Sequence, residues 1–168
     1  MDKSRMNLDG FTVETLLFAA IKSEIESEKV YSSLAGRVRN AILADRLRFL
    51  ADEEGKHRSI LERIFQHLYP EKPMELPTDT PVPLPELSTT DELVPLTDVF
   101  QRAMEAETAA RLFYSSLSER MESGDLQGTL RYLADMERGH YQILEMEKSH
   151  LERFEEMDAH IPFVHEGP

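Results

Sequence analysis

The 168-residue chain contains no cysteine. This absence excludes disulfide bonds, thiolate zinc sites and iron–sulfur centres held by this chain. Long apolar runs are also missing, since the longest, Leu16–Ile21, has six residues, whereas a membrane-spanning helix needs roughly 20. The first residues lead into no apolar segment typical of secretory signals. We therefore expect a cytoplasmic protein without membrane contact.

Positive charge is scarce relative to negative charge. Lys and Arg together number 19 against 32 Asp and Glu, which gives a formal net charge of −13. A surface of this sign repels phosphates, so nucleic acid is not expected as a partner. The acidic excess is either solvated surface or a set of metal ligands, and the net charge alone does not distinguish the two. The chain length suits a single domain over residues 1–168.

Apolar side chains recur at steps of three and four residues in four stretches, which predicts four helices. These helices form two predicted hairpins, over residues 11–68 and 91–157. Between them, residues 69–90 contain six prolines and no helical or strand period, which indicates an extended crossover. Such a crossover is long enough to carry the chain along a bundle. The tail over residues 158–168 has no period, and we expect it to dock loosely or to cross to a partner.

The two predicted hairpins are copies of one another. Glu24–Glu62 and Glu107–Glu145 align without a gap, with 17 identities in 39 positions. Amphipathic periodicity explains matching leucines, but it does not explain matching polar residues. Those matches include Glu24 with Glu107, Tyr31 with Tyr114, Glu54 with Glu137 and His57 with His140. The repeat therefore predicts an all-α four-helix bundle with approximate twofold symmetry.

The repeat symmetry brings together six Glu and His residues of the helix seams: Glu24, Glu54, His57, Glu107, Glu137 and His140. Glu54 and His57 are three residues apart, so they are neighbours on one helix face. One Glu from each of two helices, with Glu-x-x-His from each of the other two, is the ligand set of di-iron and di-manganese carboxylate bundles. Four buried carboxylates without cations would be strongly unfavourable. Because no Lys or Arg lies on the seams, we predict a dinuclear metal site rather than a polar core.

The chemistry of these ligands narrows the choice of metal. Oxygen-rich ligation with two imidazoles and without sulfur favours two ions of Fe or Mn, with Zn as another occupant. The repeat symmetry predicts two bridging carboxylates, Glu54 and Glu137, and two terminal pairs, Glu24 with His57 and Glu107 with His140.

Further polar residues stand near this ligand set in the sequence. Tyr31 and Tyr114 follow Glu24 and Glu107 by seven residues, either as hydrogen-bond donors to ligand carboxylates or as ordinary core tyrosines. Glu28 and Glu105 are weaker candidates for an additional carboxylate. Five other residues are expected to stay away from the metals, on the surface or in structural roles: Asp52, Glu53, Asp135, His67 and His150.

The sequence resembles the rubrerythrin branch of the ferritin-like superfamily over residues of about 11–158. The resemblance rests on the two Glu-to-Tyr spacings and the two Glu-x-x-His motifs in order. It implies a non-haem di-iron centre, whose six ligands are the catalytic residues, that reacts with hydrogen peroxide or dioxygen as a peroxidase or ferroxidase. It also implies a homodimer.

Two features depart from the family pattern. Full rubrerythrins carry a cysteine-rich rubredoxin domain that delivers electrons, so this chain would need an external electron-donor protein. Relatives also tend to have an extra carboxylate on the third helix, whereas Ala110 stands three residues after Glu107. Two alternatives to an oxidoreductase therefore stay open. One is iron handling, and the other is a metal-stabilised helical module that binds a partner without catalytic turnover.

Overall fold

The computed structural model describes residues 5–79, 82, 84 and 94–160. These residues form four helices, which are α1 (Val13–Arg37), α2 (Ala41–Leu68), α3 (Leu96–Ser118) and α4 (Gly124–His160). The described part contains no strand. The predicted all-α fold of four helices is therefore confirmed. Within the described ranges, none of the helices combines the length and hydropathy that a bilayer span requires.

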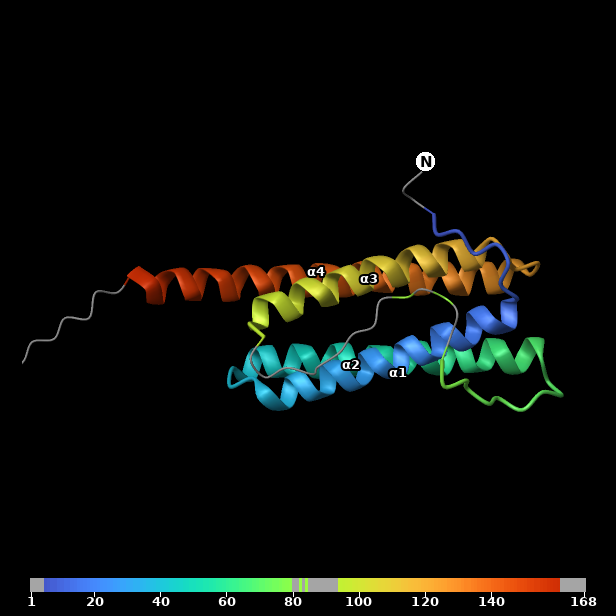
Figure 1. Cartoon of the computed structure of the whole chain (residues 1–168), viewed down its shortest axis with the longest axis horizontal. Helices are drawn as coiled ribbons and strands as arrows, with labels where there is room; N and C mark the ends of the chain where they lie inside the picture. The colour runs from blue at the N-terminus through green and yellow to red at the C-terminus, as the bar shows by residue number, and fades with distance from the viewer. Residues whose placement is uncertain (1–4, 80–81, 83, 85–93, 161–168) are drawn as a thin grey trace, which may run out of the picture.

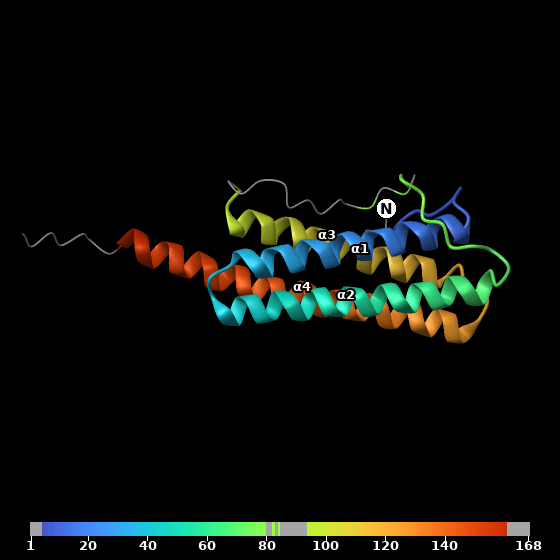
Figure 2. The ribbon, with the colours of Figure 1, turned by 90° about the horizontal axis from the view of Figure 1, so that it is seen from below.

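The four helices are arranged as two antiparallel hairpins that lie side by side along the bundle (Figures 1 and 2). α1 packs mainly on α2, and α3 mainly on α4, with α2 facing α4 and α1 facing α3 across the bundle. α3 begins at the end of the bundle where α1 turns into α2. The segment between α2 and α3 therefore has to cover the length of the bundle, as predicted for the crossover, although most of its residues from 80 onward lie outside the described part.

Local capping explains where the first two helices begin. The side chains of Thr12 and Asn40 accept hydrogen bonds from the backbone N–H groups of Thr15 and Leu43, each at 3.1 Å. A side-chain oxygen at this position satisfies one of the N–H groups that a helix start leaves unpaired. α3 begins after Pro95, which has no side-chain cap.

The end of the last helix corrects one predicted boundary. We expected the second hairpin to end at residue 157, but α4 continues to His160. The apolar period fades before that point, yet no Gly or Pro occurs there until Pro162. The spacing of apolar residues does not mark where a helix ends, so it placed this boundary too early. The remaining residues of the predicted tail, 161–168, lie outside the described part.

The core consists of two apolar clusters separated by a polar layer. One cluster includes Leu17, Ile21, Leu61, Phe65, Phe113, Leu117, Leu130 and Leu133. The other includes Val30, Leu34, Leu43, Leu47, Leu50, Phe100, Ala103 and Leu144. On every helix, the seam residues between these clusters are the Glu and His residues singled out above. The bundle thus holds these Glu and His residues in the middle of its length, with packed apolar layers on both sides.

Candidate metal centre

All four helices contribute to the polar layer. Glu24 comes from α1, Glu54 and His57 from α2, Glu107 from α3, and Glu137 and His140 from α4. Each of these residues is at most 4% exposed to solvent. Since charged residues are almost never fully buried without partners, six such residues in one layer indicate a site rather than a surface feature.

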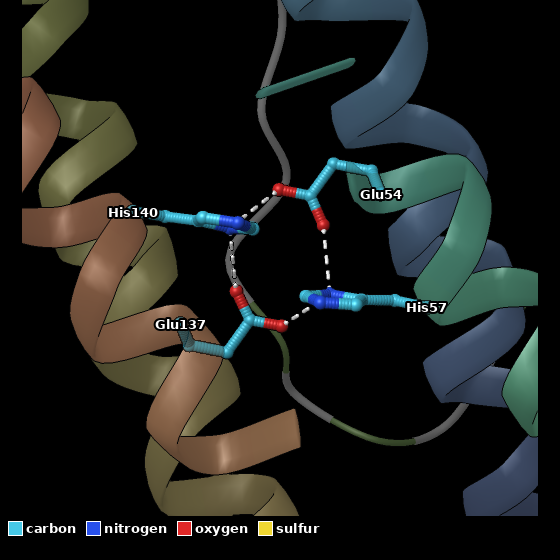
Figure 3. A group of neighbouring side chains, drawn as sticks. All are labelled: Glu54, His57, Glu137 and His140. Atoms are coloured by element: carbon cyan, nitrogen blue, oxygen red, sulfur yellow. Dashed lines mark ion pairs between the residues drawn. The ribbon is translucent and has the colours of Figure 1, made fainter. Parts of the chain in front are cut away.

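Two carboxylates and two imidazoles form the centre of the layer (Figure 3). Nδ1 of His57 lies 3.3 Å from Oε2 of Glu54 and 3.0 Å from Oε1 of Glu137. Nδ1 of His140 lies 3.1 Å from Oε1 of Glu54 and 3.2 Å from Oε2 of Glu137. Each carboxylate therefore turns one oxygen toward each imidazole. Ligand atoms from these four residues all lie within 4.8 Å of one another.

Each of the two remaining carboxylates lies beside one of the imidazoles. Oε2 of Glu24 lies 3.8 Å from Nδ1 of His57, and Oε2 of Glu107 lies 3.7 Å from Nδ1 of His140. The structure thus brings all six predicted residues into one layer, with each outer carboxylate beside one imidazole. This is the pairing expected of terminal ligands, while their binding of a metal stays a prediction.

The two tyrosines connect the hairpins across this layer. The hydroxyl of Tyr31 on α1 donates a hydrogen bond to Oε1 of Glu107, and the hydroxyl of Tyr114 on α3 donates to Oε1 of Glu24. Both tyrosines are buried. Of the two roles considered for them, the structure shows the hydrogen-bond donor. Each bond holds one carboxylate oxygen and leaves the other directed at the imidazoles.

The centre has more buried polar atoms than the described residues can satisfy. Seven side-chain atoms of Glu54, His57, Glu137 and His140 have no hydrogen-bond partner there, and they include both ring nitrogens of each imidazole. Buried polar atoms without partners are rare in native proteins. Oxygen and imidazole nitrogen are donors that divalent iron, manganese and zinc accept. The cluster is therefore compatible with binding metal ions.

The pKa shifts of the layer are also compatible with binding of metal ions. Burial raises the pKa of Glu24 and Glu107, and repulsion from Glu54 and Glu137 raises it further. Burial would also raise the pKa of Glu54, but its contacts with the imidazoles hold that pKa well below its usual range. Burial lowers the pKa of His57, whereas Glu137 and Glu54 outweigh this effect and raise it to about 9. Without cations, the layer therefore balances its negative charge with bound protons, which metal ions would displace.

Substitution of Tyr31 tests the bond between the hairpins. The variant Tyr31→Phe removes the donor to Glu107, and we expect its affinity for iron to fall by roughly 10–100-fold, because partners that orient a ligand have effects of this size. Competition with a coloured chelator measures the affinity. Tyr132→Phe is the matched control, since Tyr132 on α4 is 54% exposed. Equal affinities of the two variants would contradict an orienting role for Tyr31.

The weaker candidate carboxylates do not join the cluster. Glu28 is paired with Arg58, whose Nη1 lies 2.7 Å from its Oε2. Glu105 is exposed and accepts a hydrogen bond from Gln101. The residues expected to point away from the metals, Asp52, Asp135, His67 and His150, are exposed.

Glu53 was expected to be solvated, and this expectation is wrong. The residue is only 8% exposed, and its carboxylate pairs with the ammonium group of Lys56. The physical reason is that α2 packs on both α1 and α4. Its buried face is therefore wider than the single seam that the apolar spacing reveals.

A buried carboxylate–histidine layer in an antiparallel four-helix bundle defines a ferritin-like protein with a candidate metal centre. The model of the family described as rubrerythrin matches residues 15–148. The chain therefore belongs to the rubrerythrin family, which confirms the resemblance found in the motifs.

A solved structure supports the same fold. The chain is similar to a hypothetical protein from Pyrococcus furiosus, with 33% sequence identity over 88% of this chain and 95% of that chain, and a TM-score of 0.77. No curated protein matches the chain.

Proposed function

We propose that this protein is a non-haem di-iron oxidoreductase that reduces hydrogen peroxide or dioxygen. The observation that carries the proposal is the crossed contact of Glu54 and Glu137, each of which turns one oxygen to His57 and the other to His140. Two carboxylates in this arrangement are suited to bridge two ions. Family membership supports the same reading.

Each group in the layer has a defined task in this proposal. Glu54 and Glu137 would bridge the ions, while Glu24 with His57 and Glu107 with His140 would each complete one coordination sphere. A bound iron pair supplies Lewis acidity and electrons. Two divalent cations also balance the charge of four carboxylates, which removes the repulsion that raises the pKa of Glu24 and Glu107. The apolar clusters on both sides enclose the layer along the length of the bundle.

The electrons for repeated turnover would come from outside the chain. Reduction of one hydrogen peroxide takes two electrons and two protons and yields two waters. The sequence has no cysteine, so no iron–sulfur group within these 168 residues can deliver those electrons. We propose a separate electron-donor protein as the physiological partner, and a cytoplasmic homodimer as the working form.

Rapid mixing of ferrous protein with hydrogen peroxide tests the proposal. Oxygen-free protein loaded with iron is mixed with excess peroxide and a chemical reductant, and peroxide loss is followed over time. We expect consumption to continue until the reductant is exhausted. His140→Gln, which removes one predicted ligand, should abolish it, whereas His150→Gln, at an exposed position on the same helix, should not.

Two other results would contradict the proposal in different ways. A single oxidation followed by iron release would instead support iron handling. A metal pair that does not react with peroxide or dioxygen would leave only a metal-stabilised helical module.

A further inference from the structure

The surroundings of the centre do not share the symmetry of its ligands. On the α3–α4 side, a pocket of about 270 Å³ reaches from the surface to the polar layer. Glu107 and Glu137, both buried, line its inner part, while the exposed residues Arg111, Arg138 and Gln142 line its outer part. This pocket therefore ends beside two of the predicted metal ligands, while the carboxylate oxygens of Glu137 stay buried behind it.

The equivalent space on the α1–α2 side is filled. The repeat places Glu28 where Arg111 stands, and Arg58 where Tyr141 stands. Glu28 and Arg58 form an ion pair at 2.7 Å, with about one third of each side chain exposed. Gly55 takes the place of Arg138, and a Cβ atom at Gly55 would lie 3.6 Å from the Glu28 carboxylate. The carboxylate of this ion pair thus packs against the α2 backbone at Gly55.

The charge at the mouth of the pocket is opposite in sign to the net charge of the chain. Arg111 and Arg138 both line the outer part, and neither forms an ion pair with any residue that the structure describes. Glu145 is the nearby acidic residue of the outer part. Two guanidinium groups against one carboxylate give the mouth a positive balance, although the whole chain carries a net charge of −13. Such a local field raises the rate at which anions arrive.

We propose that the α3–α4 pocket is the entrance to the metal centre, and that Arg111 and Arg138 make it a binding site for small anions. The pocket admits an inorganic anion of a few atoms, such as azide or the hydroperoxide anion. This inference rests on the proposed function, because it assumes metal ions behind Glu107 and Glu137. It assigns access to the metal centre to the α3–α4 hairpin alone, whereas the repeated ligand set by itself would predict equal access from both hairpins.

Binding of a charged and a neutral probe tests the selectivity of the mouth. Full-length iron-loaded protein is mixed with azide in the ferric state and with nitric oxide in the ferrous state, and the absorbance change gives each association rate. For the double variant Arg111→Gln/Arg138→Gln we expect a roughly tenfold lower azide rate and an unchanged nitric oxide rate. The wild-type azide rate should also fall with added salt. The control variant, Arg58→Gln on the opposite side, should not slow azide.

A steric pair of variants tests the position of the entrance independently of charge. Gln142→Trp places a large ring at the mouth, and Ser59→Trp places the same ring at the equivalent position of the α1–α2 side. We expect Gln142→Trp to slow both probes several-fold, and Ser59→Trp to leave both rates unchanged.

The outcomes separate this inference from the proposed function. Equal azide rates in the wild type and the double arginine variant, at equal iron content, would overturn the anion site. Equal effects of the two tryptophan variants would overturn the entrance. Wild-type protein that binds no iron would instead refute the proposed function itself. Iron analysis and the thermal midpoint of each variant show that it is folded and loaded before rates are compared.

Discussion

Replacement of Glu54 with glutamine is expected to remove most of the bound metal. Each oxygen of Glu54 lies beside a different imidazole, so the substitution removes one charged ligand from both predicted metal positions at once. The loss in affinity should exceed the roughly 10–100-fold effect of removing an outer hydrogen-bond partner. Metal analysis after dialysis should show about two ions per chain in the wild type, as in other bundles with this ligand set, and fewer than one in the variant.

A matched substitution on the same helix separates this effect from a change in charge. Asp52→Asn removes one negative charge two residues before Glu54, at an exposed position. It should retain the wild-type metal content. Equal metal content in Glu54→Gln and the wild type would show that Glu54 is not a ligand and would refute the bridging geometry.

Metal binding is expected to raise the thermal midpoint of the protein by about 8–16 °C. A ligand present at 1,000 times its dissociation constant stabilises the folded state by about 4 kcal/mol, and each kcal/mol shifts the midpoint by roughly 2–4 °C in a domain of this size. The physical reason is that seven buried atoms lack partners among the described residues, and bound metal ions would supply those partners. Differential scanning calorimetry with and without ferrous iron, in the absence of oxygen, measures the shift.

The variant Glu54→Gln and the ion magnesium each provide a control for this shift of the thermal midpoint. Glu54→Gln should lose most of the gain, because it lacks a predicted ligand to both ions. Magnesium should raise the midpoint far less than iron, since it prefers oxygen ligands and retains its water. A midpoint that does not change with iron would contradict a metal centre inside the bundle.

The sequence is sufficient to predict the bundle because the patterns that specify the helices can be recognised within short stretches of the chain. Apolar spacing at three and four residues determines which face of each helix is buried, and the repeat of Glu24–Glu62 in Glu107–Glu145 shows that the hairpins are equivalent. The predictions fail at two positions where the spacing of apolar residues does not report the structure. α4 continues to His160 because periodicity does not mark helix ends, and Glu53 is buried because α2 has two packing neighbours.

The four helices, the repeated hairpin and the six residues of the polar layer follow from the sequence alone, because seam positions on amphipathic helices must meet in the core. The contacts between groups of different hairpins become visible only in the folded chain. Tyr31 reaches Glu107 rather than a residue of its own hairpin, and the spacing along one helix carries no information on that choice. The same holds for the pocket beside Glu137, because the packing of side chains from two helices decides whether a space is filled or open.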